Sequence, residues 1–336
     1  MLKIGIIGAG RMGNAHADNL INLKDVKLST VYDIDPEKSK AFAAKYPGIQ
    51  ILSSAEDVCN SPETDLIVIT SPTYCHKEGL LPAMATGKPI FCEKPLCRTR
   101  EELAELAPMI RSYKNLFAIG FVRRYSASSM QLKKLIDEGK IGKLICSSVT
   151  CLFGGYSRVW GDWFTDYEKS GGVMLDMLAH HCDLQNQIFG KPEKIYAQAF
   201  RLPKTDELPK DYVSTTITYS NGCLCNMECS WLRGGPSETY MIVYGEKGAL
   251  KYSDADGLTF YDIGGAPTKI DTDEGILGPL QDKISGGMYA TEIAYIVDCA
   301  KNPEMKPYAG AEEAIAAMEL CLGMMKSAET GEIVKF

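Results

Sequence analysis

Two patterns of hydrophobic and polar positions divide the chain. In residues 1–122, short apolar runs alternate with segments of helical periodicity. The apolar runs, each expected to be a buried strand, are residues 2–7, 27–32, 66–70, 89–92 and 116–121. The segments expected to be helices are residues 12–23, 36–45, 73–86 and 100–113. Buried strands that alternate with helices predict a parallel sheet with helices on both faces.

The pattern changes after residue 122, where we expect the boundary between two domains, residues 1–122 and 123–336, with a last helix that can pack back on the first domain. Helices are expected at residues 128–138, 172–189, 290–301 and 311–330. Strands are expected at residues 143–152, 194–202, 212–219, 223–231, 239–244 and 249–252. The close spacing of these strands predicts antiparallel neighbours. Residues 262–287 are rich in Gly, Pro and Asp and are expected to form a long loop.

Composition agrees with two globular domains and narrows the class of protein. The 336 residues carry 36 Lys and Arg against 43 Asp and Glu, a net charge of −7 that disfavours a nucleic-acid partner. No run approaches the roughly 18 apolar residues of a membrane span, so no membrane partner is expected. The N-terminus lacks the features of a signal peptide, so we expect a cytoplasmic protein.

The 12 cysteines are unusually many for such a chain. A disulfide framework belongs to short secreted domains, which this chain does not resemble. The tightest group, Cys223, Cys225 and Cys229, lies in an alternating run without a second pair at zinc-site spacing. We therefore expect no metal, and reduced, mostly buried thiols.

A glycine-rich turn at the N-terminus predicts a dinucleotide site. Gly8, Gly10 and Gly13 form a GxGxxG pattern that follows the first strand and opens the first helix, with Arg11 and Met12 between them. Such glycines allow the tight turn, the approach of a pyrophosphate and close helix packing. Asp33 follows 20 residues after Gly13, where an acid accepts hydrogen bonds from a ribose. Its charge would repel a 2′-phosphate, so NAD is expected rather than NADP.

The segment Glu93-Lys94-Pro95 places a lysine directly after a predicted strand. In an open parallel sheet, ligands bind at the carboxyl ends of the strands, where Lys94 would lie. Taken alone, Lys94 is better interpreted as a surface lysine, and only its placement opposite the glycine turn favours a role at the site. The proline after the strand favours a turn, in which a cis bond can occur.

A further group of titratable residues falls on one side of the predicted helix at residues 172–189. At 100° per residue, His180 lies about 40° from Asp176, and Asp183 about 20° on the other side. His181 points about 140° away. Carboxylates beside an imidazole fix its tautomer and raise its basicity, as a general base requires. The alternative is a histidine that is salt-bridged on a solvated face.

These motifs together resemble the Gfo/Idh/MocA oxidoreductases over essentially the whole chain. The resemblance rests on the GxGxxG turn, Glu93-Lys94-Pro95, residues 120–125 and the Ser170-Gly171-Gly172 segment that leads to Asp176, His180 and Asp183. It implies an α/β protein, with an N-terminal Rossmann domain and a C-terminal domain built on a large, mostly antiparallel open sheet. It also implies a homodimer or homotetramer.

The resemblance further implies which residues carry the chemistry. Lys94, Asp176 and His180 would act on a secondary alcohol of a sugar or polyol, and His76 matches a histidine near the nicotinamide. Thr73 departs from the family, in which many members carry Asn at that position. The residues expected at the cofactor are Gly8, Gly10, Arg11, Met12, Gly13, Asp33, Ser71, Pro72, His76, Glu93 and Lys94. Those expected at the substrate are Lys94, Arg123, Tyr156, Trp160, Trp163, Asp176 and His180, with Trp231 as a further candidate wall.

Three functions remain open for such a chain. The leading hypothesis is NAD-dependent hydride transfer to or from a secondary hydroxyl of a cyclic polyol or sugar. In a second, the oxidation is transient and allows an elimination that breaks a glycosidic bond. The third is a non-catalytic NAD-binding regulator, which would not need Lys94, Asp176 and His180. For each tryptophan among the candidate substrate walls, the alternative is packing in the core or between subunits.

Overall fold

The computed structural model describes residues 1–153, 163–200, 211–231, 237–253, 255–272 and 287–336. Contacts divide the chain into two units. One unit comprises Met1–Tyr125 with Pro279–Ile315, and the other comprises Ser126–Gly278 with Ala316–Phe336. These units are defined by contacts within the chain, and the domain limits expected above, residues 1–122 and 123–336, stay a prediction.

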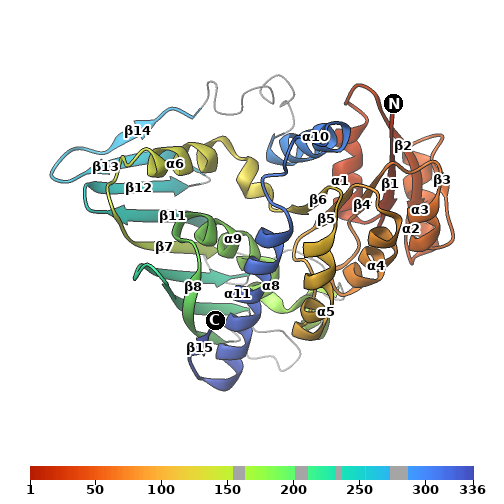
Figure 1. The fold of residues 1–336 in the computed structure, drawn as a ribbon. Coiled ribbons are helices and arrows are strands. Elements are labelled where there is room, and N and C mark those ends of the chain that lie inside the picture. Colours follow the sequence, from red (N-terminus) through yellow and green to blue (C-terminus); the bar gives the residue numbers. More distant parts are fainter. Residues whose placement is uncertain (154–162, 201–210, 232–236, 254, 273–286) are drawn as a thin grey trace. The chain divides into compact units, whose positions relative to one another are not determined.

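The first unit is built on a six-stranded parallel sheet, as the sequence predicts (Figure 1). Its strand order is β3-β2-β1-β4-β5-β6, and every pair in it is parallel. The strands are β1 (Leu2–Ile7), β2 (Val26–Tyr32), β3 (Gln50–Ile51), β4 (Leu66–Ile69), β5 (Ile90–Glu93) and β6 (Phe117–Gly120). Strands β4, β5 and β6 are buried at every position, because helices cover both faces of the sheet.

Helices connect these strands, and side chains cap the N-termini of some of them. They are α1 (Arg11–Leu20), α2 (Pro36–Lys45), α3 (Ala55–Asn60), α4 (His76–Thr86) and α5 (Arg100–Ser112), with 3₁₀ turns η1 (Thr73–Cys75) and η2 (Val122–Tyr125). The Asp35 side chain accepts from the Glu37 N–H at the start of α2, and Thr99 and Glu102 form a capping box at α5. The sequence interpretation missed β3 and α3, which are too short for a periodic signal.

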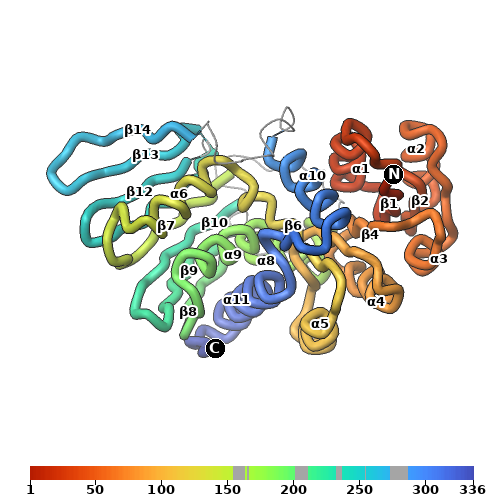
Figure 2. Tube along the Cα trace, turned by 45° about the horizontal axis from the view of Figure 1, so that its top comes forward, coloured from red at the N-terminus to blue at the C-terminus, as the bar shows by residue number. Residues whose placement is uncertain are grey.

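A helix from far along the chain completes the core of the first unit. Helix α10 (Gly287–Lys301) contacts α1, and its Ile293, Ile296 and Val297 join the hydrophobic cluster of the sheet (Figures 1 and 2). That cluster includes Ile4, Val31 and other strand residues. Burial of this apolar face stabilises α10 on the first unit, although about 160 residues of chain separate it from β6.

The second unit is built on a nine-stranded sheet with the order β14-β13-β12-β11-β7-β10-β9-β8-β15. Neighbours are antiparallel except β10 and β7, which pair in parallel. The strands are β7 (Leu144–Leu152), β8 (Pro192–Phe200), β9 (Tyr212–Tyr219), β10 (Leu224–Ser230), β11 (Glu238–Gly245), β12 (Gly248–Ser253), β13 (Gly257–Asp262), β14 (Thr268–Ile270) and β15 (Val334–Lys335). The prediction of a mostly antiparallel sheet is confirmed.

Two local predictions for this unit are wrong. The segment expected as one loop, residues 262–287, contains β14, which pairs with β13 through Phe260 and Thr268. The helix expected over residues 172–189 is two helices, α8 (Gly172–Asp176) and α9 (Leu178–Phe189), separated at Met177. Periodicity could not reveal this break, because the buried positions continue through it.

The remaining helices of this unit are α6 (Ala127–Asp137), α7 (Tyr167–Ser170) and η3 (Trp163–Thr165), with most of α11 (Ala311–Thr330). The Ser327 hydroxyl of α11 accepts from the Ala197 N–H at 2.9 Å, which ties this helix to β8. All twelve cysteines are free, and ten of them are buried. Buried thiols of this kind act as small apolar side chains.

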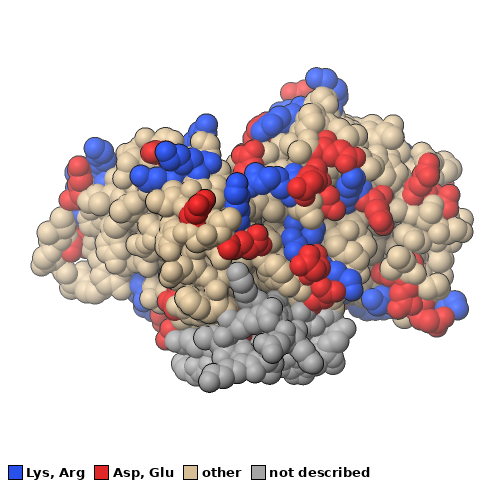
Figure 3. Space-filling model, turned by 90° about the horizontal axis from the view of Figure 1, so that it is seen from below, with Lys and Arg blue, Asp and Glu red and all other residues tan. Residues whose placement is uncertain are grey.

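Charged side chains of both signs are interspersed on the face shown in Figure 3. Exposed ion pairs occur in the described part of the chain, such as Lys133 with Asp137 at 2.6 Å. Exposed pairs of this kind add little stability, because water screens them. Of the helices in the described ranges, none combines the length and hydropathy that crossing a bilayer requires.

Candidate active site

The turn between β1 and α1 leaves no room for a Cβ at two positions, Gly8 and Gly13. Gly8 has φ of +104°, and a Cβ there would lie 2.3 Å from the Ser71 nitrogen. A Cβ on Gly13 would lie 2.1 Å from the Gly8 carbonyl oxygen. The turn therefore packs tightly against the start of α1 and the end of β4, as expected for a dinucleotide-binding turn.

The N-terminus of α1 is open to an anion. Its capping residue is Gly10, which has no side chain to accept from the first N–H groups. Asn14 instead donates from Nδ2 to the carbonyl oxygens of Ala9 and Gly10, at 3.0 and 2.9 Å, and so holds the turn in place. Arg11, the first helical residue, is exposed and adds positive charge, and Met12 is half-buried. The free N–H groups and the helix dipole fit a pyrophosphate.

Asp33 is held against the same turn at the end of β2. Its Oδ2 accepts from the Ala9 N–H at 2.8 Å, and its Oδ1 accepts from the Asp35 N–H at 2.9 Å. The Asp33 N–H donates to the Ser39 hydroxyl at 2.9 Å. These bonds place a carboxylate beside the glycine turn, where it suits the hydroxyls of a ribose and opposes a phosphate.

The segment after β4 carries Ser71, Pro72 and His76. The Thr70 hydroxyl donates to the Gly8 carbonyl at 2.6 Å, which fixes this segment on the glycine turn. His76 is buried, with Nδ1 2.8 Å from the Pro95 carbonyl oxygen and Nε2 2.9 Å from that of Ser71. Burial lowers the pKa of His76 and so favours the neutral ring. The neutral ring lies between the segments that follow β4 and β5 and donates to one of the two carbonyl oxygens, which favours a positioning role over contact with a ligand.

Lys94 lies at the carboxyl end of β5, and the Lys94–Pro95 bond is cis, as the proline suggested. The Lys94 N–H donates to Glu93 Oε2 at 3.1 Å. The other oxygen, Glu93 Oε1, lies 2.7 Å from His16 Nε2 of α1. Because β1, β4 and β5 are parallel neighbours, Lys94 emerges at the same sheet edge as the glycine turn.

The second unit holds Asp176, His180 and Asp183 on consecutive helices. Asp176 ends α8 with 8% of its surface exposed, and Asp183 in α9 is 1% exposed. His180 is half-exposed, whereas its neighbours Ala179 and His181 are buried. Of these three, His180 is therefore the residue that α9 leaves accessible to a ligand, and His181 points into the core.

The expected substrate walls are only partly described. Tyr156 and Trp160 lie outside the described residues. Trp163 is half-exposed and stacks on Phe164, with ring centroids 3.9 Å apart. Arg123 is half-buried in η2 of the first unit. Trp231 is 2% exposed, and its backbone N–H donates to Asp211, a placement that favours its packing alternative.

Sequence reasoning missed two residues beside Glu93. His16 and Glu292 are fully buried, and they form with Glu93 a group whose ligand atoms lie within 4.8 Å of one another. Such a group could hold an ion, although no metal was expected. One signal was available, since Glu292 interrupts the apolar positions of the helix around it.

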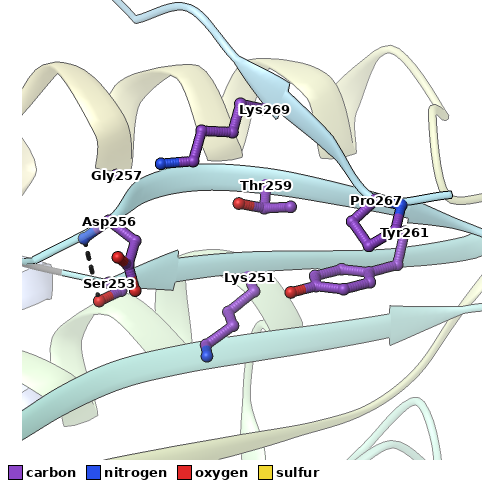
Figure 4. A pocket seen from close by; sticks show the side chains of 8 residues that line it. All are labelled: Lys251, Ser253, Asp256, Gly257, Thr259, Tyr261, Pro267 and Lys269. Atoms are coloured by element: carbon purple, nitrogen blue, oxygen red, sulfur yellow. Dashed lines mark hydrogen bonds between the residues drawn. The ribbon is translucent and has the colours of Figure 1, made fainter.

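A pocket of about 330 Å³ lies elsewhere, on strands β12 to β14 of the second unit (Figure 4). Its lining includes Lys251, Lys269, Asp256 and Tyr261, and the Asp256 N–H donates to Ser253 at its rim. None of the predicted site residues within the described ranges lines this pocket. It therefore has no part in the chemistry considered below.

Comparison with known proteins agrees with this arrangement. The family model for the oxidoreductase family with an NAD-binding Rossmann fold matches residues 2–121, and that for the GFO/IDH/MocA C-terminal domain matches residues 129–251. An uncharacterized oxidoreductase, YrbE of Bacillus subtilis, is 30% identical over 250 residues, which cover 73% of this chain and 72% of that protein. The chain belongs to the Gfo/Idh/MocA oxidoreductase family. The resemblance seen in the sequence is confirmed.

Two other relatives indicate the range of this family. Inositol 2-dehydrogenase of Rhizobium meliloti is 28% identical over 254 residues, which cover 74% of each chain. A solved structure of levoglucosan dehydrogenase with NADH and levoglucosan shares the fold, with a TM-score of 0.85 over 99% of each chain at 20% identity. This Gfo/Idh/MocA protein is thus an oxidoreductase with an NAD(P)-binding Rossmann domain, and its dehydrogenase homologues act on CH–OH groups.

Proposed function

We propose that the protein is an NAD-dependent dehydrogenase that interconverts a secondary hydroxyl of a cyclic polyol or sugar and the ketone. One observation carries this proposal: Lys94 emerges at the sheet edge where the glycine turn and Asp33 form a dinucleotide cradle. A cation at that edge can reach an oxygen next to a bound nicotinamide. The names of the relatives support the substrate class, since both inositol and levoglucosan are cyclic polyhydroxy compounds.

The proposed mechanism assigns one role to each of three residues. His180 removes the proton from the reacting hydroxyl, and Asp176 holds the imidazole and supports its charged form. Lys94 donates a hydrogen bond to the same oxygen and stabilises its developing negative charge. When bound, the nicotinamide supplies the acceptor for the hydride. The partly exposed Arg123 and Trp163 contribute a donor and an aromatic face for the ring of the substrate.

The proposal is tested by the absorbance of NADH during incubation with NAD and a panel of inositols, aldoses, amino sugars and glycosides, with NADP in parallel. We expect NADH to accumulate with at least one cyclic polyol or sugar. Release of an aglycone without net NADH would show that the oxidation is transient. Binding of NADH with no reaction across the panel would contradict a catalytic role.

The preference for NAD over NADP predicts the effect of Asp33→Ser. This variant removes the carboxylate beside the glycine turn, so NADH loses a ribose partner and a 2′-phosphate loses a repelling charge. A unit charge about 4 Å away contributes roughly 1–4 kcal/mol. We therefore expect the ratio of the NADPH and NADH dissociation constants to fall at least about tenfold, as measured by nicotinamide fluorescence.

The matched control for this prediction is Asp57→Ser, which removes an exposed carboxylate in the first turn of α3. It should leave the ratio of the two constants unchanged. An unchanged ratio in Asp33→Ser itself would show that Asp33 does not select the cofactor.

A further inference from the structure

Two carboxylates are buried together inside the first unit, beneath the turn that carries Lys94. Glu93 comes from β5 and is 5% exposed, and Glu292 comes from α10 and is 0% exposed. His16 of α1, also 0% exposed, completes the group, and one side-chain N or O atom of each residue lies within 4.8 Å of those of the others. Three elements distant in sequence therefore bring titratable side chains into one small apolar space.

The hydrogen bonds of these two carboxylates differ. Glu93 is well supplied: His16 Nε2 lies 2.7 Å from Oε1, and the Lys94 N–H donates to Oε2 at 3.1 Å. Glu292 has no hydrogen-bond partner for either oxygen within the described part of the chain. An ionised carboxylate in this position would be buried without compensation, which is strongly unfavourable.

Among the described residues, the positive charges of Arg11 and Arg123 act on Tyr289 and that of Arg124 acts on Tyr125, and none of them hydrogen-bonds to Glu292. Glu93 faces it from β5, Tyr125 from η2 and Tyr289 from its own helix, while the His16 ring is engaged by Glu93. Burial, followed by the charge of Glu93, raises the pKa of Glu292 well above its usual range. Burial likewise raises the pKa of Tyr289 to about 12, so this neighbour is neutral.

A metal ion explains this geometry less well than a proton. The 2.7 Å between His16 Nε2 and Glu93 Oε1 is a hydrogen-bond length. Two ligands of a tetrahedral ion with bonds of 2.0–2.1 Å would be about 3.3 Å apart. In contrast, a separation below 4.8 Å between the carboxylates can be closed by a side-chain rotation or by one bridging water.

We propose that Glu292 is a neutral carboxylic acid in the native protein, that it donates its proton towards Glu93, and that it is a positioning residue for Lys94. Glu93 then accepts from His16, Glu292 and the Lys94 N–H, so its side chain is held in one orientation. The turn after β5 is fixed through that carboxylate. The catalytic consequence rests on the proposed function of Lys94, whereas the protonation of Glu292 does not.

The direct test is infrared spectroscopy of the full-length protein at neutral pH. The wild type should show the carbonyl band of a protonated carboxylic acid, with a shift in D₂O, and Glu292→Gln should lack it. Glu304→Gln, which removes an exposed carboxylate beyond α10, should keep the band. Identical wild-type and Glu292→Gln spectra in this region would overturn the proposal.

The pH dependence of urea unfolding gives a second measure. The folded-state pKa of Glu292 lies above the unfolded value, so its contribution to stability is complete below the unfolded pKa, near 4.5. That contribution is lost as the pH rises towards the folded pKa. In this window the ratio of folded to unfolded protein should fall with pH more steeply for the wild type than for Glu292→Gln. The difference should be a further factor of ten for each pH unit. Parallel pH profiles would contradict an extra proton in the folded state.

The positioning role is tested by comparing two variants at the same site. Glu292→Gln keeps a donor and should retain more activity than Glu292→Leu, which has none. We expect the leucine variant to lose roughly tenfold in kcat with little change in the dissociation constant of NADH. Equal kcat in the two variants would contradict positioning.

Metal analysis of the dialysed protein distinguishes a bound ion from a proton at this group. A stoichiometric divalent ion in the wild type that Glu292→Gln lacks would overturn the proposal in favour of an ion site. If the leucine variant does not fold, the infrared result with the glutamine variant still decides the matter. The spectra and unfolding curves require no substrate, so they stand apart from any failure of the proposed dehydrogenase activity.

Discussion

Replacing His180 with alanine is expected to lower kcat by about 10²–10⁴-fold, or roughly 2.7–5.4 kcal/mol of transition-state stabilisation. The imidazole is the proposed acceptor of the hydroxyl proton, and it is the accessible residue among the titratable group of α8 and α9. NADH affinity should change little, because the cradle for the cofactor lies in the first unit. Steady-state kinetics with the best substrate of the panel and NADH fluorescence measure the two effects.

Gln187→Ala provides the matched control for this variant. It shortens a half-buried polar side chain on the same helix and should leave kcat within about twofold of the wild type. A His180→Ala protein with full activity would remove His180 from the mechanism. A parallel loss of NADH binding would instead indicate a change in the fold.

The second large effect is expected from Gly10→Ala. Gly10 has φ of −77°, and an added Cβ would meet nothing within 4 Å, so the apoprotein should unfold at the same temperature as the wild type. The same Cβ would occupy the space in which a pyrophosphate approaches the N-terminus of α1. We expect NADH affinity to fall by about 10- to 100-fold, or roughly 1.4–2.7 kcal/mol, by fluorescence titration.

Gly13→Ala separates binding from folding in this comparison. Its Cβ would lie 2.1 Å from the Gly8 carbonyl oxygen, so this variant should lower the unfolding temperature as well as NADH affinity. Equal NADH affinity of Gly10→Ala and the wild type would contradict the prediction that the pyrophosphate binds against this turn.

The cofactor site could be predicted from the sequence because its residues lie close together along the chain. Gly8, Gly13 and Asp33 follow consecutive strands at short spacing, and the backbone rules of a tight turn apply whatever packs around it. The parallel sheet was predictable for a similar reason, since buried strands joined by helices pair in few ways. Helix α2 was placed to the residue, where Pro36 and the Asp35 cap fix its start.

The role of His76 shows where local reasoning stops. The family resemblance implies that His76 lies near the nicotinamide, and the structure places its ring nitrogens 2.8 and 2.9 Å from the carbonyl oxygens of Pro95 and Ser71. Whether a histidine side chain contacts a ligand or the backbone depends on the neighbouring strand, which its own segment does not encode. The break at Met177 and the strand β14 were missed on the same ground, because packing partners decide both.

By itself, the sequence determined the alternation of strands and helices, the glycine turn with Asp33, and the lysine that ends β5. Only the tertiary structure decided that α10, from the far end of the chain, completes the first unit and buries Glu292 beside Glu93 and His16. It alone also decided that β10 pairs in parallel with β7. Periodicity records which face of an element is buried, but the element that covers this face is chosen by long-range packing, which no short stretch of sequence specifies.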